Sequence, residues 1–313
     1  MLSAETKGFV YTEAFERNLG WLTEEEQERL RNSCVAVAGL GGAGGYQVDA
    51  LVRLGVGAFK IADPDAFEVS NVNRQIGATM KTLGQPKVEI IRDMILSINP
   101  KARVETFSAG VTAENMDEFL ESADLVIDGI DYFEHEAKLL LFQKSREKGI
   151  TAVTSCPLGF GASVIVFSPE SMRYEDYFDL QEGMSDQEKR LAISFGLSPS
   201  PLCLKYMNRK ALDFDARRAA SVVSGLMLVG ALTATEAVKI LTGKDRVSYS
   251  PHVYQIDLLT HRVAGKHYRW GMKSPWLRLK RWLIFAVKLG SLKQKRSCLK
   301  HSFKISPKEF ANS

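Results

Sequence analysis

The chain has 313 residues, 45% of them hydrophobic and 25% charged. This composition suits a globular protein and excludes disordered and collagen-like chains. The net charge of +4 conceals an uneven distribution, because residues 262–313 carry 14 of the 41 Lys and Arg residues and one acid, Glu309. This segment is therefore +13 and residues 1–261 are −9, so the chain has two electrostatically different parts.

The cysteines and the apolar stretches indicate the compartment. Cys34, Cys156, Cys203 and Cys298 are scattered without a CxxC pair, so we expect neither a disulfide framework nor a four-thiolate zinc site. We therefore expect a reducing, cytoplasmic location. The N-terminus has early acids and no apolar run, so we do not interpret it as a secretory signal. The longest uncharged stretch, 219–235, is rich in small residues, and we interpret it as a core helix rather than a membrane span.

Strands and helices alternate in the first half of the chain. Residues 11–32 predict two short helices, the second capped by Thr23. A buried strand at 33–39, a glycine loop, a helix at 45–54 and a strand at 59–63 form a βαβ unit. The alternation predicts a Rossmann-like, doubly wound α/β sheet. It continues with helices at 87–98, 113–122 and 134–148 and strands at 103–107, 125–131 and 151–155.

The pattern changes after about residue 155. Residues 161–169 predict an antiparallel extension of the sheet, and the polar segment 170–218 predicts an irregular, mobile crossover. A helix over 219–242, ended by Gly243, and a strand over 252–260 follow. The expected organisation is an N-terminal helical arm at 1–32, a first Rossmann-like half at 33–160, a second half at 161–261 and a basic helical tail at 262–313.

A glycine-rich loop, GLGGAG, lies between the first predicted strand and its helix. Gly39, Gly41, Gly42 and Gly44 let the backbone approach a phosphate, and the helix N-terminus supplies amide donors. Asp63 ends the next predicted strand 19 residues after Gly44, the distance at which an acid reaches ribose hydroxyls. Together these features predict an adenine-nucleotide site.

The residues after Asp63 distinguish this site from that of an NAD-dependent dehydrogenase. A hydride transferase has no use for cations beyond the ribose, whereas a triphosphate site needs them. Asp131, which ends another predicted parallel strand, reaches the same sheet edge and is our candidate Mg²⁺ ligand. We therefore expect ATP and Mg²⁺. The other candidate nucleotide contacts are Asp65, Ser70, Asn71, Asn73, Arg74, Gln75 and Lys87.

These motifs resemble those of the ThiF/MoeB/HesA superfamily, adenylating enzymes related to the ubiquitin-activating enzymes. The resemblance begins at FERN (15–18), includes the glycine loop, the DPD…SNVNRQ…GQPKVE segment and Asp131, and resumes at ATEAVKILTG. It covers roughly residues 11–260. Gly42 then resembles the loop beneath the phosphates, and Asp63 resembles the ribose ligand. The residues that resemble polyphosphate and leaving-group contacts are Asn71, Arg74 and Lys87.

The resemblance implies adenylation of a carboxylate. An ionised carboxylate attacks the α-phosphorus of ATP and releases pyrophosphate, which needs positioning and charge neutralisation rather than a general base. The five histidines are accordingly assigned no role. The expected substrate is the C-terminal glycine of a ubiquitin-like or sulfur-carrier protein, or a peptide. Arg17 resembles an arginine that the other subunit of a dimer inserts into the site, which implies a homodimer.

Some positions depart from the family pattern. The segment after residue 169 lacks the cysteine pairs that hold zinc in many members, so no zinc is expected. Tyr132 and Glu136 stand where an asparagine and an arginine usually follow the metal aspartate. Cys203 is the nearest thiol to the family's transfer cysteine, and we keep it as a candidate nucleophile beside an incidental role. Cys156 is expected to serve packing.

Two other functions stay open. The first is an RNA modification enzyme like the tRNA threonylcarbamoyladenosine dehydratases of the same superfamily, favoured by the NVNRQ string, the missing zinc cysteines and the basic tail. The second is a nucleotide-binding scaffold with reduced catalysis, suggested by Tyr132 and Glu136.

The basic tail contains an amphipathic segment at 275–290, where Trp276, Leu279, Leu283 and Val287 recur at helical spacing among cations. This segment could dock on the body of the protein with solvated cations. It could instead lie on an anionic membrane, which would place the protein at the inner membrane face, or act as a basic arm for tRNA or an acidic partner.

Overall fold

The computed structural model describes residues 8–208 and 220–288. It contains an eight-stranded sheet in the order β3-β2-β1-β4-β5-β6-β7-β8. Strands β1 to β5 are parallel, and β6, β7 and β8 continue the sheet antiparallel. This confirms the expected α/β class and its antiparallel extension. The strands are β1 (Cys34–Ala38), β2 (Ala58–Ala62), β3 (Arg103–Phe107), β4 (Leu125–Asp128), β5 (Ala152–Leu158), β6 (Gly161–Phe167), β7 (His252–Asp257) and β8 (Arg262–His267).

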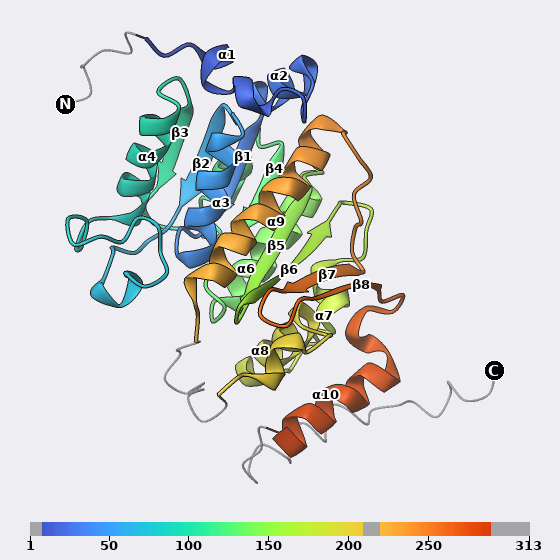
Figure 1. The fold of residues 1–313 in the computed structure, drawn as a ribbon. Coiled ribbons are helices and arrows are strands. Elements are labelled where there is room, and N and C mark those ends of the chain that lie inside the picture. Colours follow the sequence, from blue (N-terminus) through green and yellow to red (C-terminus); the bar gives the residue numbers. More distant parts are fainter. Residues whose placement is uncertain (1–7, 209–219, 289–313) are drawn as a thin grey trace.

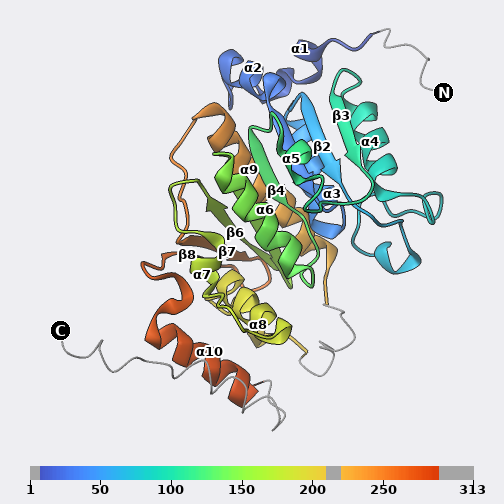
Figure 2. The same cartoon turned by 180° about the vertical axis from the view of Figure 1, so that it is seen from behind.

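Helices cover both faces of the sheet (Figures 1 and 2). One core lies beneath α3, α4 and α9, and a second core on the opposite face lies beneath α5, α6 and α7. The arrangement is the layered structure expected of a doubly wound fold. The helices of the first face are α3 (Gly42–Arg53), α4 (Lys87–Ile98) and α9 (Val223–Thr242), and those of the second are α5 (Met116–Leu120), α6 (His135–Glu147), α7 (Tyr174–Phe178) and α8 (Asp186–Leu197).

Strand β1 shows why the central strands are continuously apolar. Val35 and Val37 belong to the first core, whereas Ala36 and Ala38 belong to the second. Successive side chains of a strand point to opposite faces, and both faces of this sheet are covered. All four side chains are therefore buried.

The N-terminal helices lie at the amino ends of the strands, at the top of Figure 1. The hydroxyl of Tyr11 donates to the carbonyl of Gly55, just before β2, at 2.6 Å. Thr23 caps the last of these helices in a capping box with Glu26, as predicted. The arm consists of α1 (Tyr11–Ala14), the 3₁₀ turn η1 (Glu16–Asn18) and α2 (Glu24–Asn32).

The structure moves some predicted boundaries. Helix α3 begins at Gly42, inside the glycine loop, and α5 is shorter than the predicted 113–122. Strand β4 ends at Asp128, so Asp131 lies in the following loop and not in a strand. The amide of Gly129 still donates to the Ala38 carbonyl of β1 at 2.7 Å, and the pairing of β4 with its neighbours ends there.

The expectation of an irregular segment over 170–218 is wrong for its described part. It contains α7, α8 and the 3₁₀ turn η3 (Leu202–Lys205). Ser185 begins α8 with a capping box to Glu188, and Tyr177 and Phe178 of α7 are fully buried. The sequence pattern is weak because α7 spans little more than one helical turn. Residues 209–219 lie outside the described residues, and the mobility of the segment stays a prediction.

Helix α9 ends where Gly243 adopts a φ of +73°, a left-handed cap that glycine tolerates. It packs along α3, β5 and β6. Gly230 allows this approach, because a Cβ there would lie 2.7 Å from the Tyr46 carbonyl oxygen. Within the described residues, α9 alone is long and apolar enough to cross a membrane by length and composition. Its contacts with α3 and the sheet agree with the expected core helix.

The charge boundary at residue 262 is not a boundary of the fold. Strand β8 starts at Arg262 and pairs with β7 over its whole length. None of its residues is buried, because it forms the edge of the sheet. An exposed edge strand needs no apolar face, which is why its sequence predicted no strand. The basic tail therefore begins inside the sheet.

Helix α10 (Pro275–Lys288) docks on the region of α7 through its cations. Arg278 and Arg281 both donate to Asp179, at 2.6 and 3.1 Å, and Lys280 donates to the Pro199 carbonyl at 2.7 Å. This agrees with the docking interpretation, except that these cations are paired rather than solvated. Residues 289–313 and the Val287 side chain lie outside what the structure describes. Among residues 275–283, whose side chains the structure describes, the exposed large apolar residues are Trp276, Leu279 and Leu283.

Candidate functional site

The candidate site lies where the strand order reverses. Strands β1 and β4 are neighbours, yet the chain leaves β1 toward β2 and returns from β3 to β4 on the other side. The loops after these two strands therefore leave the sheet in opposite directions, and ligands of doubly wound sheets bind in the crevice between them. Here the two loops are the glycine loop and the segment that contains Asp131.

The glycines of the loop have two distinct roles. A Cβ on Gly39, whose φ is +87°, would overlap the carbonyl of Gly129, and one on Gly44 would overlap the carbonyl of Gly39. These two glycines allow the loops after β1 and β4 to touch. Gly41 has more room, because only the amide of Gln75 lies near it, at 3.6 Å from a Cβ built there. Gly41 and the first amides of α3 suit the approach of a phosphate.

Asp63 and Lys87 form the buried polar centre of the site. The Asp63 carboxylate accepts from the amide of Leu40, in the glycine loop, at 2.6 Å. The Lys87 ammonium lies 2.8 Å from Asp65 Oδ2 and 3.7 Å from Asp63 Oδ1. Burial raises the pKa of Asp63, and the Lys87 charge opposes that shift. The predicted ribose ligand and the predicted phosphate ligand are thus in contact.

The SNVNRQ segment forms a compact loop beside this pair. Arg74 donates from Nη1 to the Ser70 carbonyl at 2.6 Å and to Asn73 Oδ1 at 3.1 Å. Asn71 is buried, and its Oδ1 accepts from the Glu68 amide at 3.1 Å, so it shapes the loop. Gln75 is also buried, and its Oε1 has no hydrogen-bond partner among the described residues.

Asp131 follows β4 in the loop that touches Gly39. Its carboxylate is exposed and accepts from the Phe133 amide at 2.9 Å. This leaves carboxylate lone pairs for a hard cation, because Mg²⁺ prefers oxygen ligands and keeps several waters. A nucleoside triphosphate fits these groups: the Gln75 oxygen without a partner, the space at Gly41, and the cations Arg74 and Lys87. Asp131 fits its magnesium ion.

A buried ion pair behind this loop was not predicted. Lys138 of α6 donates to both oxygens of Asp128, at 2.7 and 2.9 Å, and Thr154 of β5 donates to Oδ2 at 2.7 Å. The pair joins β4, β5 and α6 at Asp128, three residues before Asp131. The predicted strand 125–131 includes Asp128, but no local pattern predicts its contact with Lys138.

Two predicted site residues lie elsewhere. Arg17 is exposed on η1, at the opposite end of the strands from the glycine loop of its own chain. Cys203 is buried in η3, and burial raises the pKa of its thiol. A reactive cysteine needs exposure and a lowered pKa, so the structure argues against Cys203 as a nucleophile. Burial raises the pKa of Cys156 to about 12, in keeping with a packing role.

Tyr132 and Glu136, the two residues that depart from the family pattern, connect the Asp131 loop to α8. The Tyr132 hydroxyl donates to the Arg190 carbonyl at 2.8 Å and also bonds to the Ser194 hydroxyl. Burial raises the Tyr132 pKa to about 12, against the effect of the Ser194 bond. Glu136 pairs with Lys189 of α8 at 3.2 Å. Both substitutions thus couple the Asp131 loop to the helix that the sequence did not predict.

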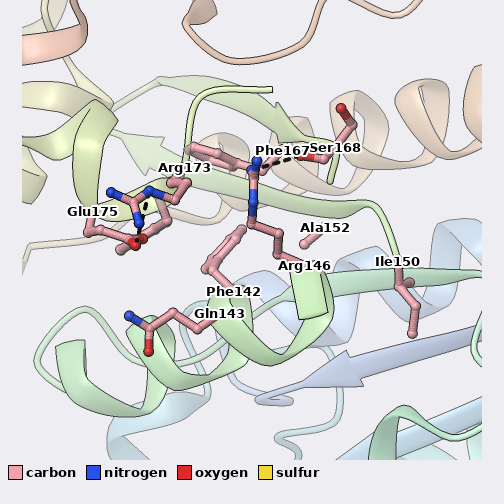
Figure 3. Close-up of a pocket in the computed structure, with 10 residues that line it drawn as sticks. Phe142, Gln143, Arg146, Ile150, Ala152, Phe167, Ser168, Arg173 and Glu175 are labelled. Carbon is pink, nitrogen blue, oxygen red and sulfur yellow. Dashed lines mark hydrogen bonds and ion pairs between the residues drawn. The ribbon is translucent and has the colours of Figure 1, made fainter. Parts of the chain in front are cut away.

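A cavity near the end of α6 is separate from this site. It measures about 20 Å³, room for roughly one water molecule. Arg146 lies at this cavity and extends toward Ser168, while Arg173 and Glu175 lie at one end (Figure 3). Arg146 also donates to the Ser171 carbonyl at 2.8 Å. None of the predicted site residues lines it, so we assign it no ligand.

The strand order reverses between β1 and β4, and a glycine loop and the buried Asp63 lie at this point. This arrangement is that of a doubly wound α/β protein with the features of a nucleotide-binding fold. The chain belongs to the ThiF family, whose model matches residues 15–271. A tRNA threonylcarbamoyladenosine dehydratase from Bacillus subtilis (strain 168) is 37% identical over 142 residues, 45% of this chain and 55% of that protein. A sulfur carrier protein adenylyltransferase from Thermus thermophilus is 39% identical over 109 residues, 35% of this chain and 40% of that protein.

These similarities are partial in sequence and broad in fold. The chain spans about half the length of the curated relatives it matches. Among solved structures, Escherichia coli MccB with MccA-N7isoASN has a TM-score of 0.64 at 16% identity, over 84% of this chain and 73% of that one. MccB has also been solved with ATP. At this identity the likeness establishes the shared fold.

Proposed function

We propose that the protein adenylates a carboxylate with ATP and Mg²⁺ and releases pyrophosphate. The observation that carries this proposal is that the loop with Gly41 touches the start of the loop with Asp131 and also donates to Asp63, the partner of Lys87. Membership of the ThiF family supports it, as do relatives named sulfur carrier protein adenylyltransferase and probable molybdopterin-synthase adenylyltransferase.

The chemistry matches the side chains present. A carboxylate oxygen bonds to the α-phosphorus of ATP while the bond from that phosphorus to the pyrophosphate oxygen breaks, and no proton is transferred. Lys87 and Arg74 supply positive charge to the polyphosphate and its leaving group. Asp63 holds the ribose while the amides of Gly41 and Gly42 face the phosphates. Mg²⁺ held by Asp131 would neutralise the phosphate oxygens when it is bound.

We propose the C-terminal glycine of a small ubiquitin-like or sulfur-carrier protein, or of a peptide, as the carboxylate. Relatives named sulfur carrier protein adenylyltransferase and SAMP-activating enzyme E1 support a carrier protein. ATP–pyrophosphate exchange tests the assignment. Exchange that requires a protein ending in glycine, and is lost when the glycine carboxylate is amidated, supports it. ATP binding without exchange toward any carboxylate would favour the scaffold function instead.

A tRNA-directed function is the second candidate. The observation that favours it is the 37% identity to the Bacillus subtilis tRNA threonylcarbamoyladenosine dehydratase. The carboxylate would then belong to a modified nucleoside in tRNA. Activity that requires tRNA, with no exchange toward carrier proteins, would replace the first assignment by this one. The Arg74→Ala variant should lose activity in either case, whereas Arg53→Ala, an exposed control on α3, should not.

We infer a homodimer from the position of Arg17. This residue is exposed at the end of the sheet opposite its own glycine loop, so only Arg17 of the partner subunit could enter a site. Trp21, which is 84% exposed, and Leu19 offer apolar surface beside it. Mixing Arg17→Ala with Asp131→Ala subunits should restore part of the activity. The absence of rescue in a mixed dimer would contradict shared sites.

Contact of residues 275–290 with an anionic membrane stays a proposal, as does the cytoplasmic location. The support is the exposed apolar side of α10, where Trp276 is 70% exposed beside Leu279 and Leu283. Flotation with phosphatidylglycerol vesicles tests the contact. Wild-type protein that floats and Trp276→Ser protein that does not would support it, and equal sedimentation of both away from the vesicles would reject it.

A further inference from the structure

Three potential metal ligands meet where α6 and α8 begin. His135 and Glu136 are the first residues of α6, and Asp186 is the first residue of α8. Each offers one ligand atom, and these atoms lie within 4.8 Å of one another. Asp131, the proposed magnesium ligand, is not part of this group. The group is therefore distinct from the nucleotide site, although His135 follows Asp131 by only four residues in the sequence.

The buried histidine is the unusual member. His135 is 6% exposed, and neither ring nitrogen has a hydrogen-bond partner among the described residues. Buried polar atoms in proteins almost always have such a partner, because a buried polar group without a hydrogen bond loses its hydration without compensation. The two acids stand in the first turns of helices, where a carboxylate is stabilised in any case. The position of the two acids is thus explained by the helix N-termini, but the burial of His135 without a hydrogen-bond partner is not.

The spacing of the group suits a metal ion better than a hydrogen bond. His135 Nε2 lies 3.4 Å from Asp186 Oδ1 and 4.0 Å from Glu136 Oε1. Hydrogen bonds from nitrogen to oxygen are shorter than these distances. Two ligands bound at about 2.1 Å to a tetrahedral ion are about 3.4 Å apart. Glu136 is exposed, so its side chain can move closer to the other two ligand atoms.

We propose that His135, Glu136 and Asp186 bind a divalent transition-metal ion of the Zn²⁺ class. An imidazole with two carboxylates is a donor set for zinc, whereas Mg²⁺ and Ca²⁺ take oxygen ligands alone. Three protein ligands leave a fourth position for water. The proposal goes beyond the adenylation chemistry, which needs no ligand from this group.

Lys189 competes with the ion. Its ammonium lies 3.2 Å from Glu136 Oε1 and neutralises part of the charge of the acidic pair. Metal binding must displace it from that oxygen or share the oxygen with it. Removal of the ammonium should therefore strengthen metal binding, whereas a purely structural histidine cluster would show no such gain.

A bound ion would join α8 to the loop that carries Asp131. The same two segments already meet through Tyr132, whose hydroxyl bonds to the Arg190 carbonyl and to Ser194. The metal would act as a positioning element there, because its ligands do not overlap with the residues that face the nucleotide crevice.

Zn²⁺ titration of the full chain, without ATP or Mg²⁺, tests the proposal. One Zn²⁺ should bind per chain, and Co²⁺ should give the visible absorption of a tetrahedral site. Glu136→Gln and Asp186→Asn should each weaken binding about tenfold or more, and Lys189→Met should strengthen it several-fold. Glu24→Gln, an exposed first-turn acid of α2, and His267→Asn, an exposed histidine of β8, are matched controls without effect.

The outcomes separate this site from the proposed enzyme. Because Glu136, Asp186 and Lys189 are not buried, their variants should remain folded where His135→Asn could fail. Binding that survives both acid variants, or falls equally in the controls, would be adventitious and would overturn the proposal, as would Mg²⁺ competing on equal terms with Zn²⁺. Loss of pyrophosphate exchange in Asp131→Ala with Zn²⁺ affinity unchanged would show that the two sites are independent.

Discussion

The parallel and antiparallel parts of the sheet use their polar side chains differently. In the part from β1 to β5, polar groups follow the carboxyl ends of the strands, where Asp63 lies beside Lys87 after β2 and Asp131 follows β4. In the part from β6 to α10, polar groups tie elements together, as Asp179 ties α10 to the chain after α7 and Asp257 accepts from Tyr206 at 2.6 Å. We propose that polar groups of the first part face a ligand, whereas those of the second hold its elements together.

Lys138→Met tests whether the parallel part also depends on an internal ion pair. It leaves the Asp128 carboxylate buried without its cation, so the free energy of unfolding should fall by about 3–5 kcal/mol. Urea denaturation measures this change. Lys144→Met, on the exposed side of the same helix, should change the midpoint little, and adding Asp128→Asn to Lys138→Met should recover stability. Equal effects of the two lysine variants would contradict the importance of the buried pair.

Asp131→Ala tests the carboxyl edge as the site of chemistry. Pyrophosphate exchange should fall about 10²–10³-fold, because the proposed magnesium ligand is lost, while the structure loses only the hydrogen bond from the Phe133 amide. The melting temperature should stay unchanged, since the side chain is exposed. Asp245→Ala, in an exposed turn after α9, is the control. Wild-type exchange by the Asp131 variant would remove the proposed site.

Asp179→Asn tests cohesion in the antiparallel part. Asp179 has a left-handed φ of 59°, which asparagine tolerates, so the change removes charge without straining the backbone. Loss of the pairs to Arg278 and Arg281 should cost about 1–3 kcal/mol and expose α10 to limited proteolysis. Exchange activity should be retained. A loss of activity as large as that of Asp131→Ala would mean that the two parts are not separable.

Tyr132→Phe probes the connection between the two parts and should cost about 1 kcal/mol. The Tyr132 pKa is raised by burial to about 12, above the value near 10 of an unfolded chain. The stability that this hydroxyl contributes is therefore complete below about pH 10 and is lost as the pH rises through about 12. Unfolding free energy should fall more steeply in wild type than in the variant over that range. Parallel curves would contradict the raised pKa.

Local sequence patterns predicted the strands and helices of the parallel part, although the structure moved the boundaries of α3, α5 and β4. The run after Ser33 predicted β1 because each residue of a strand covered on both faces is apolar, and the segments 87–98 and 103–107 match α4 and β3 at both ends. The glycine loop and Asp63 were placed at one sheet edge from spacing alone. In parallel sheets that edge always collects the loops after the strands, so the chain order is enough to bring these residues together.

The sequence by itself determined the α/β class and the glycine loop between β1 and α3, because each depends on residues close in the chain. It also predicted the acids and cations that we propose for nucleotide binding. The tertiary structure decided the contacts between distant residues. It paired Asp179 with Arg278, placed Arg17 away from its own site and brought Asp186 to His135. Such contacts follow no period along the chain, since they depend on how α8 and α10 pack and on which side chains that packing removes from water.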